Sequence, residues 1–319
     1  MSVAATISEK AVALDARQIA WLESLESDRL SALKSQRARA VLSAIGLLSA
    51  LPAFFYFLDV HLQVSDPRVK YGIPALVAYA AYTFAMQPVR AFKLRVKSGL
   101  LSKIAAGFGL TYDTNPGDTG LEDRFRDIEL VPYYSSFKSE DRFQGDFRGI
   151  PLDLVECHME KMRFTGKRAR RVTTFRGLLG RLAFKKRFRG RTLITNDQGL
   201  FNSFRFVGGN LGRVKLEDPV FEGVFEVYST DQVEARYLLT PAFMERLVEL
   251  SALFKHATVR VAFDAGDLLI AIDKREPSFE IASIAQPLAD SPAIKELTQE
   301  LLIFDAIVST LNLTQTTRI

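Results

Sequence analysis

The sequence predicts an α+β protein: an N-terminal helix, a two-helix transmembrane hairpin, and a cytosolic, mostly antiparallel sheet domain with a C-terminal helix. Two long uncharged runs lie within the first 90 residues, apolar–polar alternation at strand spacing follows residue 100, and helix-start signals precede two later segments. The 319 residues, 48% hydrophobic and 25% charged, suffice for one or two domains with cores. This composition excludes a disordered chain and a many-pass membrane protein.

Residues 1–39 predict a cytosolic amphipathic helix. Residues 7–36 lack glycine and proline and are rich in good helix formers. The apolar stripe could pack on the rest of the chain, on a second subunit or on the membrane. Its members recur at spacings near three, four and seven: Leu14, Trp21, Leu22, Leu25 and Leu33.

Residues 40–91 predict the transmembrane hairpin, with spans at about 40–58 and 71–89. The first run has 19 uncharged residues, which as a helix cover about 28 Å, close to the thickness of the hydrocarbon core. The second run is uncharged over 71–87, and only twelve residues separate the two runs. The alternative is a buried hairpin in a soluble helical core, but two such runs so close together favour the bilayer.

The flanking charges predict the orientation of the hairpin. Two acids and two bases occupy the connecting loop, whereas bases cluster before the first span and after the second. The positive-inside rule therefore predicts a multi-pass protein with two spans. Both termini and the domain at 100–319 are expected in the cytosol. The single cysteine, Cys157, excludes an intramolecular disulfide framework and agrees with a reducing compartment. The flanking bases are Lys34, Arg37, Arg39, Arg90, Lys93, Arg95, Lys97 and Lys103.

Alternation and turn signals define the expected elements of the cytosolic domain. A helix at 240–255 has Thr240 as N-cap and Pro241 in its first turn, and a last helix is expected at about 291–312. A barrel-like roll closed by that last helix fits the pattern. Strands are expected at 141–147, 150–157, 191–195, 224–228, 257–263 and 267–273, the last two joined by a turn at 264–266.

A basic tract at 161–191 holds thirteen bases and no acid. The whole chain has 42 bases and 37 acids, so without this tract it would be net acidic. An anionic partner is expected: lipid headgroups first, an acidic protein partner, or, less favoured because no nucleic-acid motif accompanies the tract, nucleic acid. The structural alternative is a solvated segment paired with the acidic remainder. The residues proposed to bind the anionic surface are Lys167, Arg168, Arg170, Arg171, Lys185, Lys186, Arg187 and Arg189.

The motifs of common enzymes are missing from the sequence. It has no phosphate-binding P-loop, no serine-hydrolase elbow and no second ligand pair at zinc spacing beside Cys157-His158. Cys157 lies in an apolar strand and is expected to be a core residue rather than a nucleophile. No catalytic, cofactor or metal residue is therefore assigned.

Four phrases resemble an uncharacterised bacterial family, domain-of-unknown-function family 3137. They are FRGLL at 175–179, FRGRT at 188–192, VKLEDPVF at 214–221 and FEVYSTDQVEARYLLTPAFMERL at 225–247. The resemblance covers roughly 40–285 and implies a two-pass protein of the bacterial inner (cytoplasmic) membrane with a cytosolic α+β domain. It implies no activity and no catalytic residue, and it does not include the arginines at 163–171.

The longest phrase also has a structural interpretation. Residues 231–236 are expected to form a polar turn between a strand and the helix that begins at Thr240. Arg236 is expected to pair with Asp231 or Glu234 and fix this structural corner, with a ligand site as the alternative.

These observations favour a non-enzymatic, membrane-anchored binding or scaffold protein of unknown process. Its expected partners are the lipid bilayer, anionic headgroups, and a protein partner or a second copy of the chain. The alternative is an enzyme that acts on a lipid or another anionic substrate. A third hypothesis, transport, requires oligomers because the predicted spans carry no internal charge.

Overall fold

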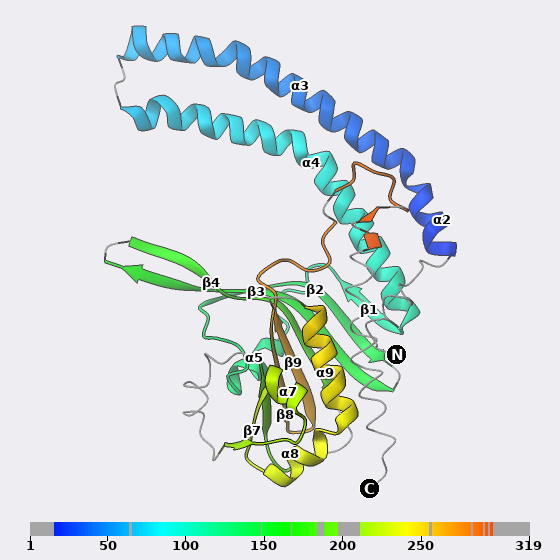
Figure 1. Ribbon diagram of the computed structural model, residues 1–319. Helices are drawn as coiled ribbons and strands as arrows, with labels where there is room; N and C mark the ends of the chain where they lie inside the picture. Colours follow the sequence, from blue (N-terminus) through cyan, green and yellow to red (C-terminus); the bar gives the residue numbers. More distant parts are fainter. Residues whose placement is uncertain are drawn as a thin grey trace. The chain divides into compact units, whose positions relative to one another are not determined.

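The computed structural model describes residues 16–63, 66–147, 149–166, 168–183, 188–196, 211–254, 257–281, 283–289, 291–292 and 294–295. The chain divides into two compact units, one comprising Leu14–Gly99 with Ile281–Ile294 and the other built on Leu100–Glu280. The first unit is helical, and the second contains a large antiparallel sheet (Figure 1). The α+β class predicted from the sequence is therefore correct.

The helical unit consists of α2 (Ala16–Ser24), α3 (Glu26–Phe57), the π-helical turn η1 (Leu58–Leu62) and most of α4 (Pro67–Gly107). The second part of the predicted amphipathic helix continues directly into the predicted first span, because α3 runs from Glu26 to Phe57 without a break. Within α2, Leu22 is fully buried, and the Trp21 ring lies so close to Gly99 that a Cβ there would approach it to 2.5 Å. Part of the apolar stripe therefore packs within the chain.

Helices α3 and α4 lie alongside each other and run in opposite directions. The Arg39 guanidinium lies 4.8 Å above the centre of the Phe84 ring. Near the other end, Lys70 forms a 2.6 Å ion pair with Asp59. Side chains along both helices face solvent, including Leu48, which is 76% exposed.

One helical segment of the described residues, Ala16–Leu62, is long and apolar enough to cross a membrane. The mean hydropathy of its most apolar window is 2.0, and only 6% of that window is buried. Helix α4, which contains the predicted second span, does not meet the same criterion. Its tyrosines and prolines at 71–89 lower its mean hydropathy. The structure thus supports one candidate span, and the predicted two-span topology is not shown.

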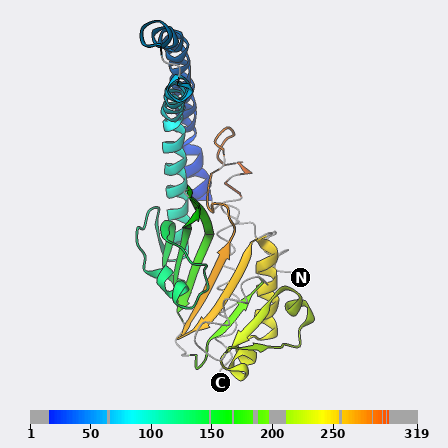
Figure 2. The ribbon, with the colours of Figure 1, turned by 90° about the vertical axis from the view of Figure 1, so that its left-hand side faces the viewer.

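The described residues form a sheet of nine strands in the order β1-β2-β3-β4-β9-β8-β5-β7-β6, and all neighbouring pairs are antiparallel. Figure 2 shows this sheet. Its two outer strands in the described chain are β1 and β6, so the expected barrel-like roll is not observed. The strands are β1 (Leu110–Asp113), β2 (Ser136–Phe147), β3 (Ile150–Thr165), β4 (Arg168–Ala183), β5 (Thr192–Thr195), β6 (Gly212–Val214), β7 (Glu226–Ser229), β8 (Thr258–Asp264) and β9 (Asp267–Asp273).

Helices cover both faces of this sheet. Helix α5 (Leu121–Asp127) contributes the buried Phe125 to a core with Cys157 and Ala262. Helix α9 (Pro241–Leu253) places Phe243 against Phe263, with ring centres 5.5 Å apart. Because Ala262 and Phe263 are consecutive in one strand, their side chains point to opposite faces. Two short helices, α7 (Pro219–Val224) and α8 (Gln232–Leu238), complete the described elements.

Local sequence signals explain several of these elements. The hydroxyl of Thr240 caps α9 by accepting the N–H of Phe243, and Pro241 occupies the first turn, as expected. The predicted β8–β9 hairpin turns through Ala265 and Gly266, both at positive φ. Strand β4, in contrast, was not predicted, because its arginines mask the alternation. The expected C-terminal helix falls almost entirely outside the described residues.

Candidate functional site

Strands β3 and β4 continue beyond the rest of the sheet as a two-stranded ribbon (Figure 1). Pairing of β2 with β3 ends at Glu160, and pairing of β9 with β4 begins only at Gly177. Residues 161–165 and 168–172, here called the β arm, pair with each other, and no other described strand flanks them. At about 3.3 Å per residue, five residues extend the ribbon by roughly 16 Å.

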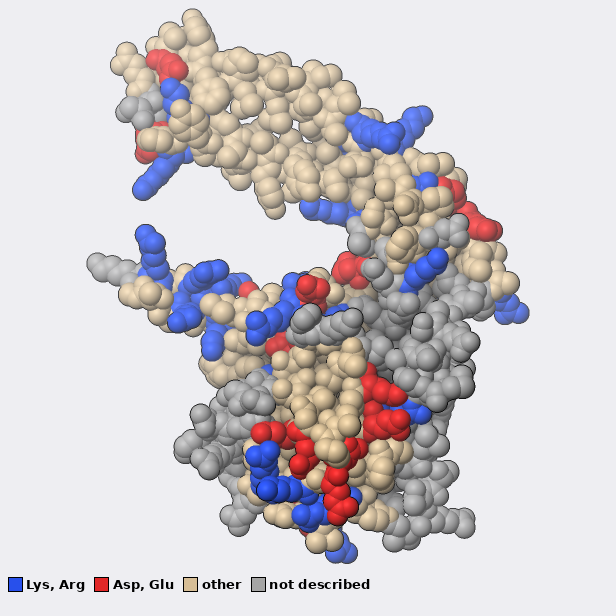
Figure 3. All heavy atoms as spheres, viewed as in Figure 1, with Lys and Arg blue, Asp and Glu red and all other residues tan. Residues whose placement is uncertain are grey.

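The β arm is rich in bases that lack acidic partners. Arg171 lies 3.8 Å from Glu160 and is 70% exposed. The other four bases are also exposed, and no ion pair within the described part of the chain reaches them. Figure 3 shows Lys and Arg side chains gathered along this ribbon. These four bases are Lys161, Arg163, Arg168 and Arg170.

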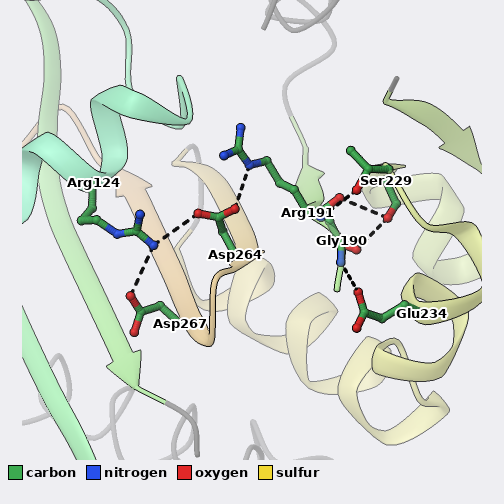
Figure 4. Close-up of polar contacts among 9 residues, drawn as sticks. Arg124, Gly190, Arg191, Ser229, Glu234, Asp264 and Asp267 are labelled. Atoms are coloured by element: carbon green, nitrogen blue, oxygen red, sulfur yellow. Dashed lines mark hydrogen bonds and ion pairs between the residues drawn. The ribbon is translucent and has the colours of Figure 1, made fainter. Parts of the chain in front are cut away.

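Two bases further along the basic tract, Arg181 and Arg191, differ from those of the β arm, because acids on the β8–β9 hairpin neutralise them. Asp264 accepts from Arg191 at 2.9 Å and from Arg124 of α5 at 3.2 Å (Figure 4). Asp267 accepts from Arg181 at 3.2 Å. Both acids are mostly buried, so their charges are held by these guanidinium groups. The structural alternative therefore describes Arg181 and Arg191, whereas the β arm retains unpaired charge.

The residues proposed from the sequence thus fall into three groups. Arg168, Arg170 and Arg171 lie together on the β arm. Arg189 is exposed but lies in the connection before β5, away from the arm in sequence and in strand order. Lys161 and Arg163 also lie on the β arm but were not among the residues proposed from the sequence. The signal that could have found them is the period-two alternation on both sides of Gly166, at φ +59°, which is typical of a hairpin. Lys167, Lys185, Lys186 and Arg187 lie outside the described residues.

Two residues of the expected structural corner, Asp231 and Glu234, make contacts other than those expected. Asp231 caps α8 by accepting the N–H groups of Val233 and Glu234, both at 3.0 Å. The expected polar turn is therefore mostly a short helix. The carboxylate of Glu234 accepts the backbone N–H groups of Arg189 at 2.8 Å and Gly190 at 2.7 Å (Figure 4).

Arg236, the third residue of the expected corner, is exposed, and within the described residues it has no ion pair with Asp231 or Glu234. The corner is fixed by a carboxylate that binds backbone amides, not by an ion pair. This contact joins two of the phrases that resemble the family, FRGRT at 188–192 and the phrase at 225–247.

Two features of the described residues bear on chemistry: the Cys157 thiol and a hollow beside α5. Cys157 is 1% exposed, as expected of a core residue, and burial raises the pKa of its thiol well above the ordinary value. No group of three or more His, Cys, Asp or Glu side chains that could hold a metal occurs among the described residues. A hollow of about 470 Å³ beside α5 is lined in part by Asp118, Glu122 and Tyr134.

Burial, followed by the nearby carboxyl of Asp118, raises the pKa of Glu122 in this hollow, against the opposing effect of hydrogen bonds from its own backbone and from Thr119. Burial also raises the pKa of Tyr134. A carboxyl with a raised pKa can act as a general acid. The hollow is therefore the place to test the enzyme hypothesis.

Comparisons with known proteins give a match to a family model over part of the chain and a distant structural likeness. No curated protein matches the chain. A solved structure described as the mycobacterial trehalose monomycolate transport factor A, TtfA, is 11% identical to it, with a TM-score of 0.35, and the match covers 65% of this chain and 93% of that one. Residues 173–313 match the family model described as "Protein of unknown function (DUF3137)". This match begins at 173, not at 40 as the resemblance implied, and leaves the whole β arm outside it. Over residues 173–313, the chain is therefore similar to the DUF3137 family of proteins of unknown function.

Proposed function

We propose that this protein is a membrane-anchored binding protein whose β arm contacts anionic lipid headgroups. The observation that carries the proposal is the pairing state of the bases: Arg181 and Arg191 are neutralised by Asp267 and Asp264, whereas four bases of the β arm have no ion pair in the described chain. Unpaired charge on a ribbon without flanking strands is available to an external anion.

Electrostatics gives the proposed contact a magnitude. Each base close to an anionic leaflet contributes about 1 kcal/mol, so four bases contribute roughly 4 kcal/mol, or about a thousandfold in the ratio of bound to free arm. The attraction weakens once salt shortens the Debye length to a few ångströms. Lipid is favoured over nucleic acid because the chain contains a candidate membrane span, which brings a bilayer within its reach. Any protein partner or second copy of the chain is left as an outcome of the test.

We further propose that α4 recrosses the membrane that α3 crosses, which keeps both termini on the cytosolic side of a bacterial inner membrane. Only residues 63–66 separate η1 from α4. A chain that crosses the membrane with α3 therefore enters α4 directly at the far surface, and α4 runs back in the opposite direction. Exposed apolar side chains on α4, such as Leu76 at 67%, support burial in lipid. Glycosylation or thiol-labelling reporters at Gln63 and at the C-terminus test this: labels on opposite sides are expected, and labels on one side would contradict it.

The headgroup contact can be tested with the full chain in lipid nanodiscs. Thr165 lies on the β arm and carries no charge, so a Thr165→Cys variant can hold a fluorescent probe, while buried Cys157 stays unlabelled. Headgroup-attached nitroxides should quench this probe in discs containing anionic lipid and much less in zwitterionic discs. The matched control is Val233→Cys on α8, where the native side chain is 79% exposed.

Neutralising the four unpaired bases to Gln, or adding about 0.5 M salt, should strongly reduce the quenching at position 165. Equal quenching in anionic and zwitterionic discs, or in the neutralised variant, would contradict the proposal. If the probe stays unquenched in every disc, the arm does not bind headgroups, and an acidic protein becomes the partner to seek by purification from native membranes.

A further inference from the structure

The β arm has two chemically different faces. In an antiparallel ribbon, residues directly opposite each other point to the same side, and consecutive residues alternate. Lys161 lies opposite Val172, Arg163 opposite Arg170, and Thr165 opposite Arg168. All four unpaired bases therefore share one face, here called the cationic face.

The other face of the β arm is apolar near its tip. It carries Met162 opposite Arg171, and Phe164 opposite Ala169. The Phe164 side chain is 73% exposed and that of Met162 is 42% exposed, so neither is covered by the rest of the described chain. Two large exposed apolar side chains at i and i+2 form a continuous patch, here called the apolar face.

This division does not follow from the needs of the fold. A ribbon that only faces water is normally kept polar, and its edges are protected by charge. Exposed bases on both strands already protect this one, and they do not account for an exposed phenylalanine two residues before the turn at Gly166. An aromatic and a thioether side chain beside guanidinium groups are instead typical of segments that lie at a membrane interface.

We infer that the β arm lies in the bilayer interface with its apolar face toward the acyl chains, so that Phe164 and Met162 lie below the headgroups and the cationic face lies at the level of the phosphates. Phe164 is the more exposed of these two side chains, so its insertion buries the larger apolar surface. Arg171 shares the apolar face but lies two pairs further from the turn than Phe164, where its long side chain can keep the guanidinium among the headgroups. The inference rests on the proposed function and deepens it by adding apolar insertion to charge attraction.

The two contributions are separable by experiment. Charge attraction alone needs only the cationic face, fails at high salt and leaves the apolar face in water. Insertion removes a phenylalanine side chain from water, which corresponds to at least a tenfold increase in the ratio of inserted to free arm. That part of the affinity resists salt.

Probes on the two faces distinguish these cases in nanodiscs that contain anionic lipid and the full chain. Ala169→Cys places a probe on the apolar face beside Phe164, and Thr165→Cys places one on the cationic face. Nitroxides on the lipid acyl chains should quench the probe at 169 and shift its emission to the blue, whereas headgroup nitroxides should quench the probe at 165. Val233→Cys remains the control that neither nitroxide quenches.

Substitution of the inserted side chain completes the test. Phe164→Ser should lower the ratio of inserted to free arm at least tenfold, measured as acyl-chain quenching of the probe at 169. Headgroup quenching of the probe at 165 should persist in low salt. Because Phe164 is exposed, this variant should fold normally, and unchanged burial of the Cys157 thiol verifies that.

Each outcome has a defined meaning. Headgroup quenching at 165 without acyl-chain quenching at 169 would overturn the insertion and leave the proposed headgroup contact intact. Loss of both signals would overturn the proposed function and the inference together. Protection of the probe at 169 in detergent without lipid would assign the apolar face to a protein contact and overturn the insertion.

Discussion

Removal of the Glu234 carboxylate should destabilise the sheet unit. Glu234→Ala deletes two hydrogen bonds, from the N–H groups of Arg189 at 2.8 Å and Gly190 at 2.7 Å. A hydrogen bond to a charged group contributes about 1.5–3 kcal/mol when buried. The contact to Arg189 is exposed to water and that to Gly190 is partly buried, so water can replace part of both. A total loss of about 2 kcal/mol is expected.

A loss of this size should lower the Tm of a unit of about 180 residues by roughly 4–8 °C. The unit contains a convenient reporter, since the thiol of Cys157 is buried in its core. A fluorogenic maleimide added during a thermal ramp of the full chain in detergent therefore follows unfolding of the sheet separately from the helices. Glu234→Gln keeps an acceptor oxygen without the charge and should give an intermediate Tm.

The matched control is Arg236→Ala, two residues away on the same helix and exposed. Its effect should stay within about 0.5 kcal/mol, because it removes no described ion pair. If Glu234→Ala and Arg236→Ala lowered the Tm equally, the amide contact would not be what holds the corner, and the reasoning would be wrong.

Three further predictions concern the sheet unit. Gly177→Ala should prevent stable folding, because its Cβ would lie 2.0 Å from the carbonyl oxygen of Ile272. Gly180→Ala should fold, because its Cβ would lie 3.5 Å from the nearest side chain. Soluble expression and Cys157 labelling during a thermal ramp distinguish the two variants. Glu122→Gln should stabilise the protein at pH 7 but not below the ordinary glutamate pKa of 4.5. Because the pKa of Glu122 is raised in the folded protein, ionisation of this carboxyl lowers the free energy of unfolding as pH rises above 4.5. A difference in urea midpoint between variant and native protein that does not change with pH would refute this prediction. Native Cys157 should react with a thiol reagent only at the rate of unfolding, and rapid labelling at pH 8 would contradict its burial and raised pKa.

The sequence determined much of the local structure, because the deciding interactions are short-range. The cap of Thr240 on α9 and the turn between β8 and β9 depend on residues within a few positions of each other. An uncharged run long enough to cross a membrane is likewise visible without neighbours, which is why the segment that contains α3 was recognised. The family resemblance also depended on sequence alone, and it is confirmed over 173–313.

Only the tertiary structure decided which bases of the 161–191 tract are paired. Asp264 and Asp267 follow Arg191 by more than 70 residues, and strand order alone brings them to Arg181 and Arg191. The two faces of the β arm also depend on the register of β3 against β4. A shift of one residue would exchange the faces of one strand relative to the other, and composition does not record register. The sequence therefore determined that the tract is basic, whereas pairing across the sheet determined where its charge remains free.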